Sequence, residues 1–258
     1  MTNQDRVFIL VGSTARFKPQ NDEQVVGPAN TQINTESNPV QIPLTYCATC
    51  GVTWLVGEIG LDAATKHPTH NTYEHIYAGT SRSLVVFIDG ACPSNGPAAL
   101  QASVGVYFGP DSPKNISRII DTNNPTNQLA EITAALEAMR KVRSTVVLER
   151  RSLVKASFPG TGADKLRDLC HFRLILGTDS SYLVDCLCEY MPQWTSDDQN
   201  QVYGNRQGQT IKNSEGFRML YEETELLSMV GVQVVWYYVP RDFNHEADAL
   251  ANAALPVA

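Results

Sequence analysis

Short runs of β-branched and aliphatic residues alternate with stretches of helical periodicity from residue 84 onward. Apolar runs bounded by turn residues are typical of buried strands, and apolar residues three and four apart are typical of packed helices. The predicted strands are residues 84–90, 102–108, 117–121, 172–176 and 232–239. The predicted helices are residues 129–142, 181–190, 214–229 and about 244–254. This order predicts an α/β fold in which helices pack on a central mixed sheet.

The rest of the chain has a different pattern. Residues 14–45 are rich in Asn, Gln, Thr, Pro and Ser without a sustained period, so residues 1–43 are expected to be mostly flexible. Residues 44–80 form a small element with cysteines and histidines, and a polar joint separates it from the larger unit, residues 84–258. Within that unit, residues 144–170 mix Arg, Lys, Pro and Gly, which predicts an exposed insertion.

Composition sets broad limits. With 258 residues, 43% of them apolar, the chain can bury one sizeable core. No apolar run approaches the length of a membrane span, and the N-terminal residues lack the basic start of a signal peptide. The six cysteines are scattered, which is typical of a reducing compartment. We therefore expect an intracellular protein, nuclear or cytoplasmic, with no membrane partner.

The net charge of −7 argues against a nucleic-acid ligand at first sight, because such proteins usually present a basic face and this chain has no basic run. The exception is a protein whose acids are clustered at a metal site and neutralised there.

Four acids stand in contexts that suit such a site. Asp89 ends an apolar strand and Asp179 follows another, and side chains at the ends of central strands lie at one rim of a sheet. Glu131 lies in an apolar helix, and Asp248 lies on the alanine-rich last helix. Each could instead be a cap or a solvated acid. Together they predict a cation site, because acids in apolar surroundings are costly unless paired or metal-bound.

The segments around these acids resemble type 1 ribonuclease H, in its histidine-less branch and with an extra N-terminal region. They occur in the family's order, over roughly residues 84–255. The matching segments are IDGACPSNG (88–96) with the strand that follows it, TNQLAEI (126–132), LGTDSSY (176–182) and YVPRDFNHEADALA (238–251).

The resemblance implies a ribonuclease H-like five-stranded mixed sheet flanked by helices, preceded by the small Cys/His-containing element. It implies that Asp89, Glu131, Asp179 and Asp248 bind two Mg²⁺ or Mn²⁺ ions. The implied activity is hydrolysis of the RNA strand of an RNA–DNA hybrid by a two-metal mechanism, which leaves 3′-hydroxyl and 5′-phosphate ends.

The resemblance also implies substrate contacts. Residues at the positions of Asn95 and Thr126 bind a DNA phosphate, and those at Asn127 and Gln128 read the RNA minor groove. Ser180, beside the third acid, is a further candidate. Trp194 could stack along the DNA strand or pack in the core.

Two features depart from the family pattern. The loop that holds a catalytic histidine in many members is shortened here, and His245 aligns with a helix start instead. Arg241 is the candidate substitute, for product release or phosphate positioning, although it could be a plain surface arginine. In the region of the family's basic protrusion, Asp197 and Asp198 replace lysines. We therefore expect weak hybrid binding with a shallow dependence on salt.

The small element offers a separate metal site. Cys47, Cys50, His67 and His70 could bind a structural zinc ion, with His75 as a competing ligand. The alternative is a buried cysteine pair with surface histidines. This region could also contact a protein partner.

Two other functions stay open from the sequence. One is a related metal nuclease of the exonuclease or junction-resolvase type, against which Asn127 and Gln128 argue. The other is a non-catalytic ribonuclease H-like binding module, which the acidic charge favours and the complete set of acids opposes.

Overall fold

A computed structural model describes residues 7–10, 40–48, 50–55, 83–93, 101–197 and 202–256. Its central sheet has the spatial order β6-β5-β4-β7-β10. The strands are β4 (Ser83–Ala91), β5 (Ala102–Tyr107), β6 (Ile116–Ile120), β7 (Phe172–Thr178) and β10 (Val232–Tyr238). β4, β5 and β6 are antiparallel neighbours, whereas β7 is parallel to both β4 and β10. This confirms the predicted five-stranded mixed sheet.

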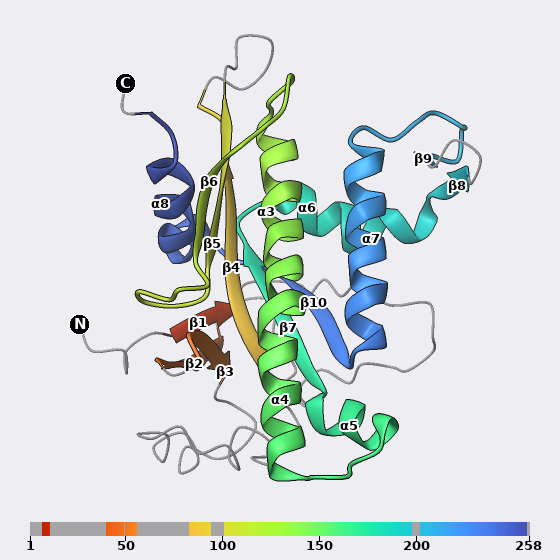
Figure 1. Ribbon diagram of the computed structural model, residues 1–258. Helices are drawn as coiled ribbons and strands as arrows, with labels where there is room; N and C mark the ends of the chain where they lie inside the picture. Colours follow the sequence, from red (N-terminus) through yellow and green to blue (C-terminus); the bar gives the residue numbers. More distant parts are fainter. Residues whose placement is uncertain are drawn as a thin grey trace.

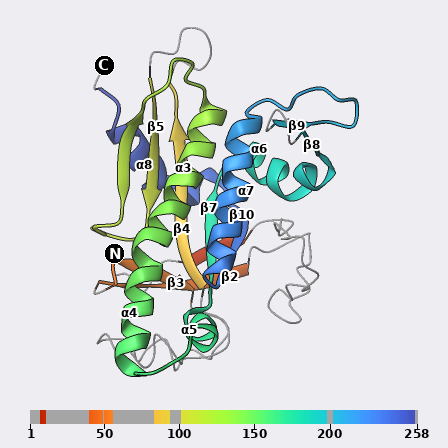
Figure 2. The same ribbon diagram turned by 45° about the vertical axis from the view of Figure 1, so that its right-hand side comes forward.

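Helices cover both faces of the sheet (Figures 1 and 2). One face contacts α3 (Asn127–Lys141) and α7 (Ser214–Met229), and α3 also contacts the short α6 (Ser181–Asp185). α8 (His245–Ala253) lies over β5 and β4 on the opposite face. α6 is followed by η3 (Cys186–Tyr190) and η4 (Met191–Gln193), and η5 (Arg241–Phe243) precedes α8. The helices predicted at 129–142, 181–190, 214–229 and 244–254 are therefore present within a few residues.

Strand residues alternate between the two faces. Leu84, Val86 and Ile88 belong to the main core with α3 and α7, while Val85 packs with Ile175 on the other side. A side-chain period of two gives this alternation, and cover on both faces explains why the strand is apolar at nearly every position. The carboxylate at the end of β4 is thus mounted on a rigid, fully enclosed strand.

Three further strands precede the main sheet: β1 (Val7–Leu10), β2 (Val40–Cys47) and β3 (Val52–Leu55). β1 pairs with β2, β2 with β3, and β3 with the first residues of β4, all antiparallel. Because β7 lies along one edge of β4, β3 and β5 share its other edge in succession. The described part of residues 44–80 therefore extends the main sheet, a pairing that the sequence analysis did not predict. The domain boundaries stay predictions.

Residues 144–170 are mostly helical. α3 passes through a π-helical turn, η2 (Val142–Val146), into α4 (Val147–Ser157), and α5 (Ala163–Cys170) follows. Val154, Leu166 and Cys170 form a small buried cluster, and Arg150 is only 6% exposed. The expectation of an exposed segment was wrong at these positions, because one side of α4 packs on α5 and the sheet. Whether the segment is an insertion stays a prediction.

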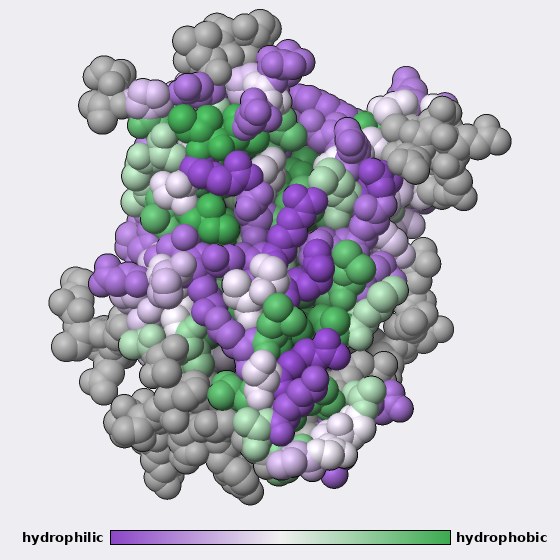
Figure 3. Space-filling view, viewed as in Figure 1, coloured by the Kyte–Doolittle hydropathy of each residue, from purple (hydrophilic) through white to green (hydrophobic). Residues whose placement is uncertain are grey.

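Between η4 and α7 lies a small hairpin of β8 (Thr195–Asp197) and β9 (Val202–Gly204). It stands where the sequence analysis placed the counterpart of the basic protrusion. On the face seen in Figure 3, hydrophilic residues run between small apolar groups. Within the described ranges, no helix is both long and apolar enough to cross a membrane.

Candidate active site

Two of the predicted acids meet at one rim of the sheet. Asp89 lies near the end of β4 and is 6% exposed, and Asp179 directly follows β7. β4 and β7 are parallel neighbours, so their carboxyl ends reach the same rim. Carboxylate oxygens of Asp89, Glu131 and Asp179 all lie within 4.8 Å of one another. The structure thus brings together three acids that are 42 and 48 positions apart in the chain (131 − 89 and 179 − 131).

Glu131 reaches this cluster because α3 approaches β4 closely. A Cβ atom on Gly90 would lie 2.4 Å from the backbone nitrogen of Glu131, so only glycine fits between strand and helix. Thr126 begins the helix, and its Oγ1 accepts a hydrogen bond from the Leu129 amide at 3.1 Å. Thr178 Oγ1 donates to Glu131 Oε2 at 3.5 Å, at the edge of hydrogen-bonding range.

Asn244 orients Asp179. It is 1% exposed, and its Nδ2 donates to Asp179 Oδ1 at 2.9 Å and to the Ile88 carbonyl at 3.0 Å. One amide therefore ties the start of α8 to both acid-bearing strands. The sequence analysis missed this role, because an asparagine before a helix is usually interpreted as a cap. The position of Asn244, one helical turn before Asp248, was the signal in the sequence that could have indicated this role.

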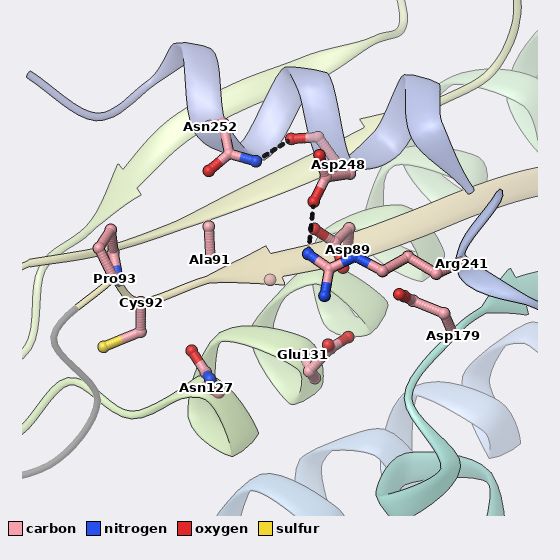
Figure 4. Close-up of a pocket in the computed structure, with 11 residues that line it drawn as sticks. Asp89, Ala91, Cys92, Pro93, Asn127, Glu131, Asp179, Arg241, Asp248 and Asn252 are labelled. Atoms are coloured by element: carbon pink, nitrogen blue, oxygen red, sulfur yellow. Dashed lines mark hydrogen bonds and ion pairs between the residues drawn. The ribbon is translucent and has the colours of Figure 1, made fainter. Parts of the chain in front are cut away.

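Asp248 comes from α8, which packs directly on the backbone of β5. A Cβ atom on Gly105 would lie 2.0 Å from the Ala247 carbonyl oxygen. Asp248 Oδ1 accepts a bond from Arg241 Nη2 at 3.2 Å, and Figure 4 shows the Arg241 guanidinium reaching in among the acids. The Arg241 side chain is 79% exposed, so this ion pair offsets little of the site's negative charge.

The acids repel one another strongly. Burial, followed by the charges of Asp179 and Asp248, raises the pKa of Asp89 to about 8. Burial and the charges of Asp89 and Asp179 also raise the pKa of Glu131 well above its ordinary value. Such a cluster is ionised at neutral pH only if a cation compensates it. Hard carboxylate oxygens are the ligands that Mg²⁺ and Mn²⁺ prefer, so the residues present fit such an ion.

The acids line a cavity of about 350 Å³. Figure 4 shows the remaining lining residues around them. These neighbours are Gly90, Ala91, Cys92, Pro93, Asn127, Arg241 and Asn252. Cys92, Pro93 and Asn252 were not predicted as site residues, since their place depends on how β4 and α8 meet.

The other predicted substrate residues have mixed positions. Asn127 lines the cavity and is exposed, whereas Gln128 is half-buried and its Oε1 has no hydrogen-bond partner among the described residues. Ser180 caps α6, accepting a bond from the Leu183 amide at 3.3 Å. Asn95 lies outside the described residues.

Trp194 lies away from the carboxylates. It is half-buried and packs edge-on against Phe217, with ring centroids 5.2 Å apart, and against Tyr203 at 5.6 Å. The packing alternative is therefore realised in this structure, and stacking on a DNA strand stays a prediction. Of the predicted zinc ligands, Cys47 and Cys50 lie at the β2–β3 turn, and His67 and His70 lie outside the described residues.

Comparison with known proteins gives consistent matches to ribonuclease H proteins. No family model matches the chain. Ribonuclease H1 from Rattus norvegicus is 28% identical over 174 residues, which cover 66% of this chain and 49% of that protein. Ribonuclease H1 from Homo sapiens is 28% identical over 173 residues, with the same coverage. Ribonuclease H from Schizosaccharomyces pombe is 26% identical over 186 residues, covering 71% and 57%.

These matches make the chain similar to ribonuclease H1 proteins over about two thirds of its length. It spans about half the length of the mammalian ribonuclease H1 relatives that it matches. Solved structures of ribonuclease H1 proteins are also similar. LC11-RNase H1, isolated from compost, has 18% identity and a TM-score of 0.40, covering 66% of this chain and 93% of that one. The enzyme of Halobacterium salinarum has 21% identity and a TM-score of 0.37, covering 67% and 96%.

Proposed function

We propose that this chain is a metal-dependent endonuclease that hydrolyses the RNA strand of RNA–DNA hybrids. The supporting observation is the cluster of Asp89, Glu131 and Asp179, with oxygens within 4.8 Å of one another at the rim of the sheet. Similarity to ribonuclease H1 proteins supports the substrate class. A buried cluster of acids does not stabilise the fold, because unpaired buried acids are destabilising.

In the proposed mechanism, Asp89, Glu131, Asp179 and Asp248 would hold Mg²⁺ or Mn²⁺. When bound, two such ions supply activation of the attacking water and stabilisation of the leaving oxygen in an in-line displacement. Asp89 is central, because it belongs to the cluster and its pKa also responds to Asp248. Asn244 keeps the Asp179 carboxylate turned toward the cluster of acids through the hydrogen bond at 2.9 Å.

Arg241 has a different role in this proposal. Its exposed guanidinium contacts Asp248 at the mouth of the cavity, where it can meet a phosphate of the substrate or product. An arginine is well suited to bind a phosphate through paired N–H groups. Asn127 lines the same cavity, and we propose that it and Gln128 contact the RNA strand, where 2′-hydroxyls distinguish RNA from DNA.

The test is cleavage of a labelled hybrid in Mg²⁺ or Mn²⁺, alongside single-stranded RNA, duplex RNA and duplex DNA. We expect cleavage of the hybrid's RNA strand alone. Asp179→Asn should abolish it, and Asp164→Asn, the same change at an exposed acid on α5, should not. Equal cleavage of duplex DNA would contradict the substrate class. No cleavage by folded protein would contradict the enzymatic function.

A further inference from the structure

The positive charge of this acidic chain is concentrated in one segment. Residues 140–173 contain nine Lys and Arg residues and three Asp and Glu residues, which leaves +6 in a chain whose total is −7. Residues 174–258, by contrast, contain four basic and twelve acidic residues, which leaves −8. Much of the basic segment belongs to one long helix, in which α3, η2 and α4 follow one another without a break (Figures 1 and 2).

Both acids on the outer side of this helix are already paired with cations from other elements. Glu137 Oε1 accepts a bond from Arg118 Nη2 on β6 at 2.5 Å. Glu149 Oε1 accepts one from Lys114 Nζ, in the turn between β5 and β6, at 3.0 Å. The third acid of the helix, Glu131, belongs to the carboxylate cluster. The helix therefore has no acid left to neutralise its own surface cations.

Four basic residues of the helix form no ion pair within the part of the chain that the structure describes. They are Arg140, Lys141, Arg151 and Lys155. Arg140 and Lys155 are exposed, Lys141 and Arg151 are half-exposed, and Figure 3 shows hydrophilic side chains over α4. Arg151 and Lys155 are four residues apart, where like charges repel each other on a helix. This arrangement does not favour the helix itself, so it points to an anionic ligand.

The same helix begins at the carboxylate cavity, because Asn127 lines it. At 1.5 Å per residue, Arg140 lies about 20 Å along the helix from Asn127, and Lys155 about 40 Å. Phosphates of one strand follow at intervals of about 3.4 Å, so about six nucleotides reach as far as Arg140 and about twelve as far as Lys155. A duplex that enters the cavity and follows the helix therefore meets these cations in succession.

We propose that Arg140, Lys141, Arg151 and Lys155 form a phosphate-binding surface that holds a nucleic-acid duplex outside the carboxylate cavity. The surface rests on the proposed function for the identity of the duplex, an RNA–DNA hybrid. Exposed Ser144 lies between the cations on the same helix, and serine hydroxyls commonly contact phosphates. The β8–β9 hairpin has Asp197 where the family's basic protrusion has lysines, so the α3–α4 helix supplies the cations that the hairpin lacks.

The test measures binding in an Asp179→Asn background, so that the duplex stays intact. Fluorescence anisotropy of a labelled hybrid, about 24 base pairs long so that it exceeds the helix, gives Kd over a series of salt concentrations. The triple variant Arg140→Gln, Arg151→Gln, Lys155→Gln should raise Kd about tenfold or more. It should also reduce the slope of log Kd against log salt by about two to three, since each lost phosphate contact removes about 0.9.

The matched control keeps the charge at the same three positions. Arg140→Lys, Arg151→Lys and Lys155→Arg together should leave Kd within about twofold and the salt slope unchanged, since phosphate attraction depends on charge. Thermal unfolding of both triple variants checks that each is folded. An equal loss of affinity in the glutamine variant and in the charge-keeping variant would overturn the proposal.

Duplex DNA of the same length is the second probe. Phosphate contacts do not require a 2′-hydroxyl, so the glutamine variant should lose salt dependence on DNA as well. This result can be obtained even if the chain cleaves no hybrid, and hybrid cleavage by the unmodified chain tests the proposed function separately. Equal Kd and equal salt slopes with and without the three cations, on both duplexes, would overturn the proposal. That outcome is the one expected of a surface that binds an acidic protein instead.

Discussion

The two clusters of charged and reactive side chains in this protein are built in opposite ways. At the rim of β4 and β7, three acids meet within 4.8 Å, and the fourth, Asp248, pairs with the exposed Arg241. Beside α4, two buried cations lie next to two thiols, and Arg150 has donors without acceptors. The carboxylate cluster has an excess of negative charge, whereas beside α4 Lys114 is paired with Glu149 and only Arg150 keeps unmatched donors.

This contrast between the two clusters indicates which of them is suited to bind a ligand. Clustered carboxylates present hard oxygen atoms and call for a hard divalent cation. The cations beside α4 are instead held by packing, since Arg150 lies against the Trp54 and Phe172 rings and Lys114 pairs with Glu149. The first site should govern chemistry and the second should govern stability, and the following experiments separate them.

Asp89→Asn should have the largest effect on activity. It removes a ligand central to the proposed metal site, so we expect kcat for hybrid cleavage to fall by about 10³-fold or more, equivalent to several kcal/mol of transition-state stabilisation. Arg150→Met, beside α4, should leave kcat within about threefold, since it lies outside that site. Steady-state kinetics at saturating Mg²⁺ measures both. A comparable loss in Arg150→Met would show that the two clusters are coupled.

Gly90→Ala should have the next largest effect, and on stability as well as activity. The added Cβ would overlap the α3 backbone at 2.4 Å, so strand and helix must separate. We expect the free energy of unfolding to fall by about 2–3 kcal/mol, and cleavage to fall with the displacement of Glu131. Urea unfolding provides the measurement. Gly162→Ala is the control, because nothing lies within 4 Å of that position.

Asn244→Ala should lower activity about 10- to 100-fold, the usual range for a residue that orients a metal ligand. Its bond to Asp179 would be lost, so the Mg²⁺ concentration for half-maximal activity should rise as well. Asn124→Ala, at an exposed position outside the cavity lining, should change neither quantity. A loss of stability with an unchanged Mg²⁺ requirement would show that Asn244 acts on folding alone.

The smallest expected effect is the dependence of the free energy of unfolding on pH. In the folded metal-free protein, Asp89 keeps its proton up to about pH 8, whereas in the unfolded chain it loses the proton near its ordinary pKa of 3.8. The folded state therefore binds more protons between these values, and stability falls as pH rises through them. We expect the free energy of unfolding to fall over this range, and to fall less in Mg²⁺ and in Asp89→Asn. Thermal unfolding in chelator from pH 4.5 to 8.5 tests this, and a flat profile would contradict it.

Much of the central fold was predictable because its strands are apolar at nearly every position. Sequences such as Leu84–Ile88 need cover on both faces, which restricts them to an inner strand. The acids were predictable for the related reason that Asp89 and Asp179 follow such strands directly. Local sequence was therefore sufficient to predict a side chain's position where a single strand or helix determines that position.

What could not be predicted depends on contacts between distant segments. The pairing of Trp54 with Leu84 has no local signal, since residues 56–82 separate the two strands in the chain. Arg150 resembled a surface arginine in a charged stretch, and only the packing of α4 buries it. Asn244 resembled a simple helix start, and only the meeting of α8 with β4 and β7 reveals its bonds.

The pairing of β4 on both edges also affects the order in which parts of the protein unfold. Its residues pair with β7 on one edge and with β3 and then β5 on the other, from Ser83 to Ala91. Amide protons of a strand enclosed in this way exchange with solvent only when the whole domain unfolds. The backbone that bears Asp89 should therefore be among the last segments to exchange deuterium, while the exposed α8 residues around Asp248 exchange earlier.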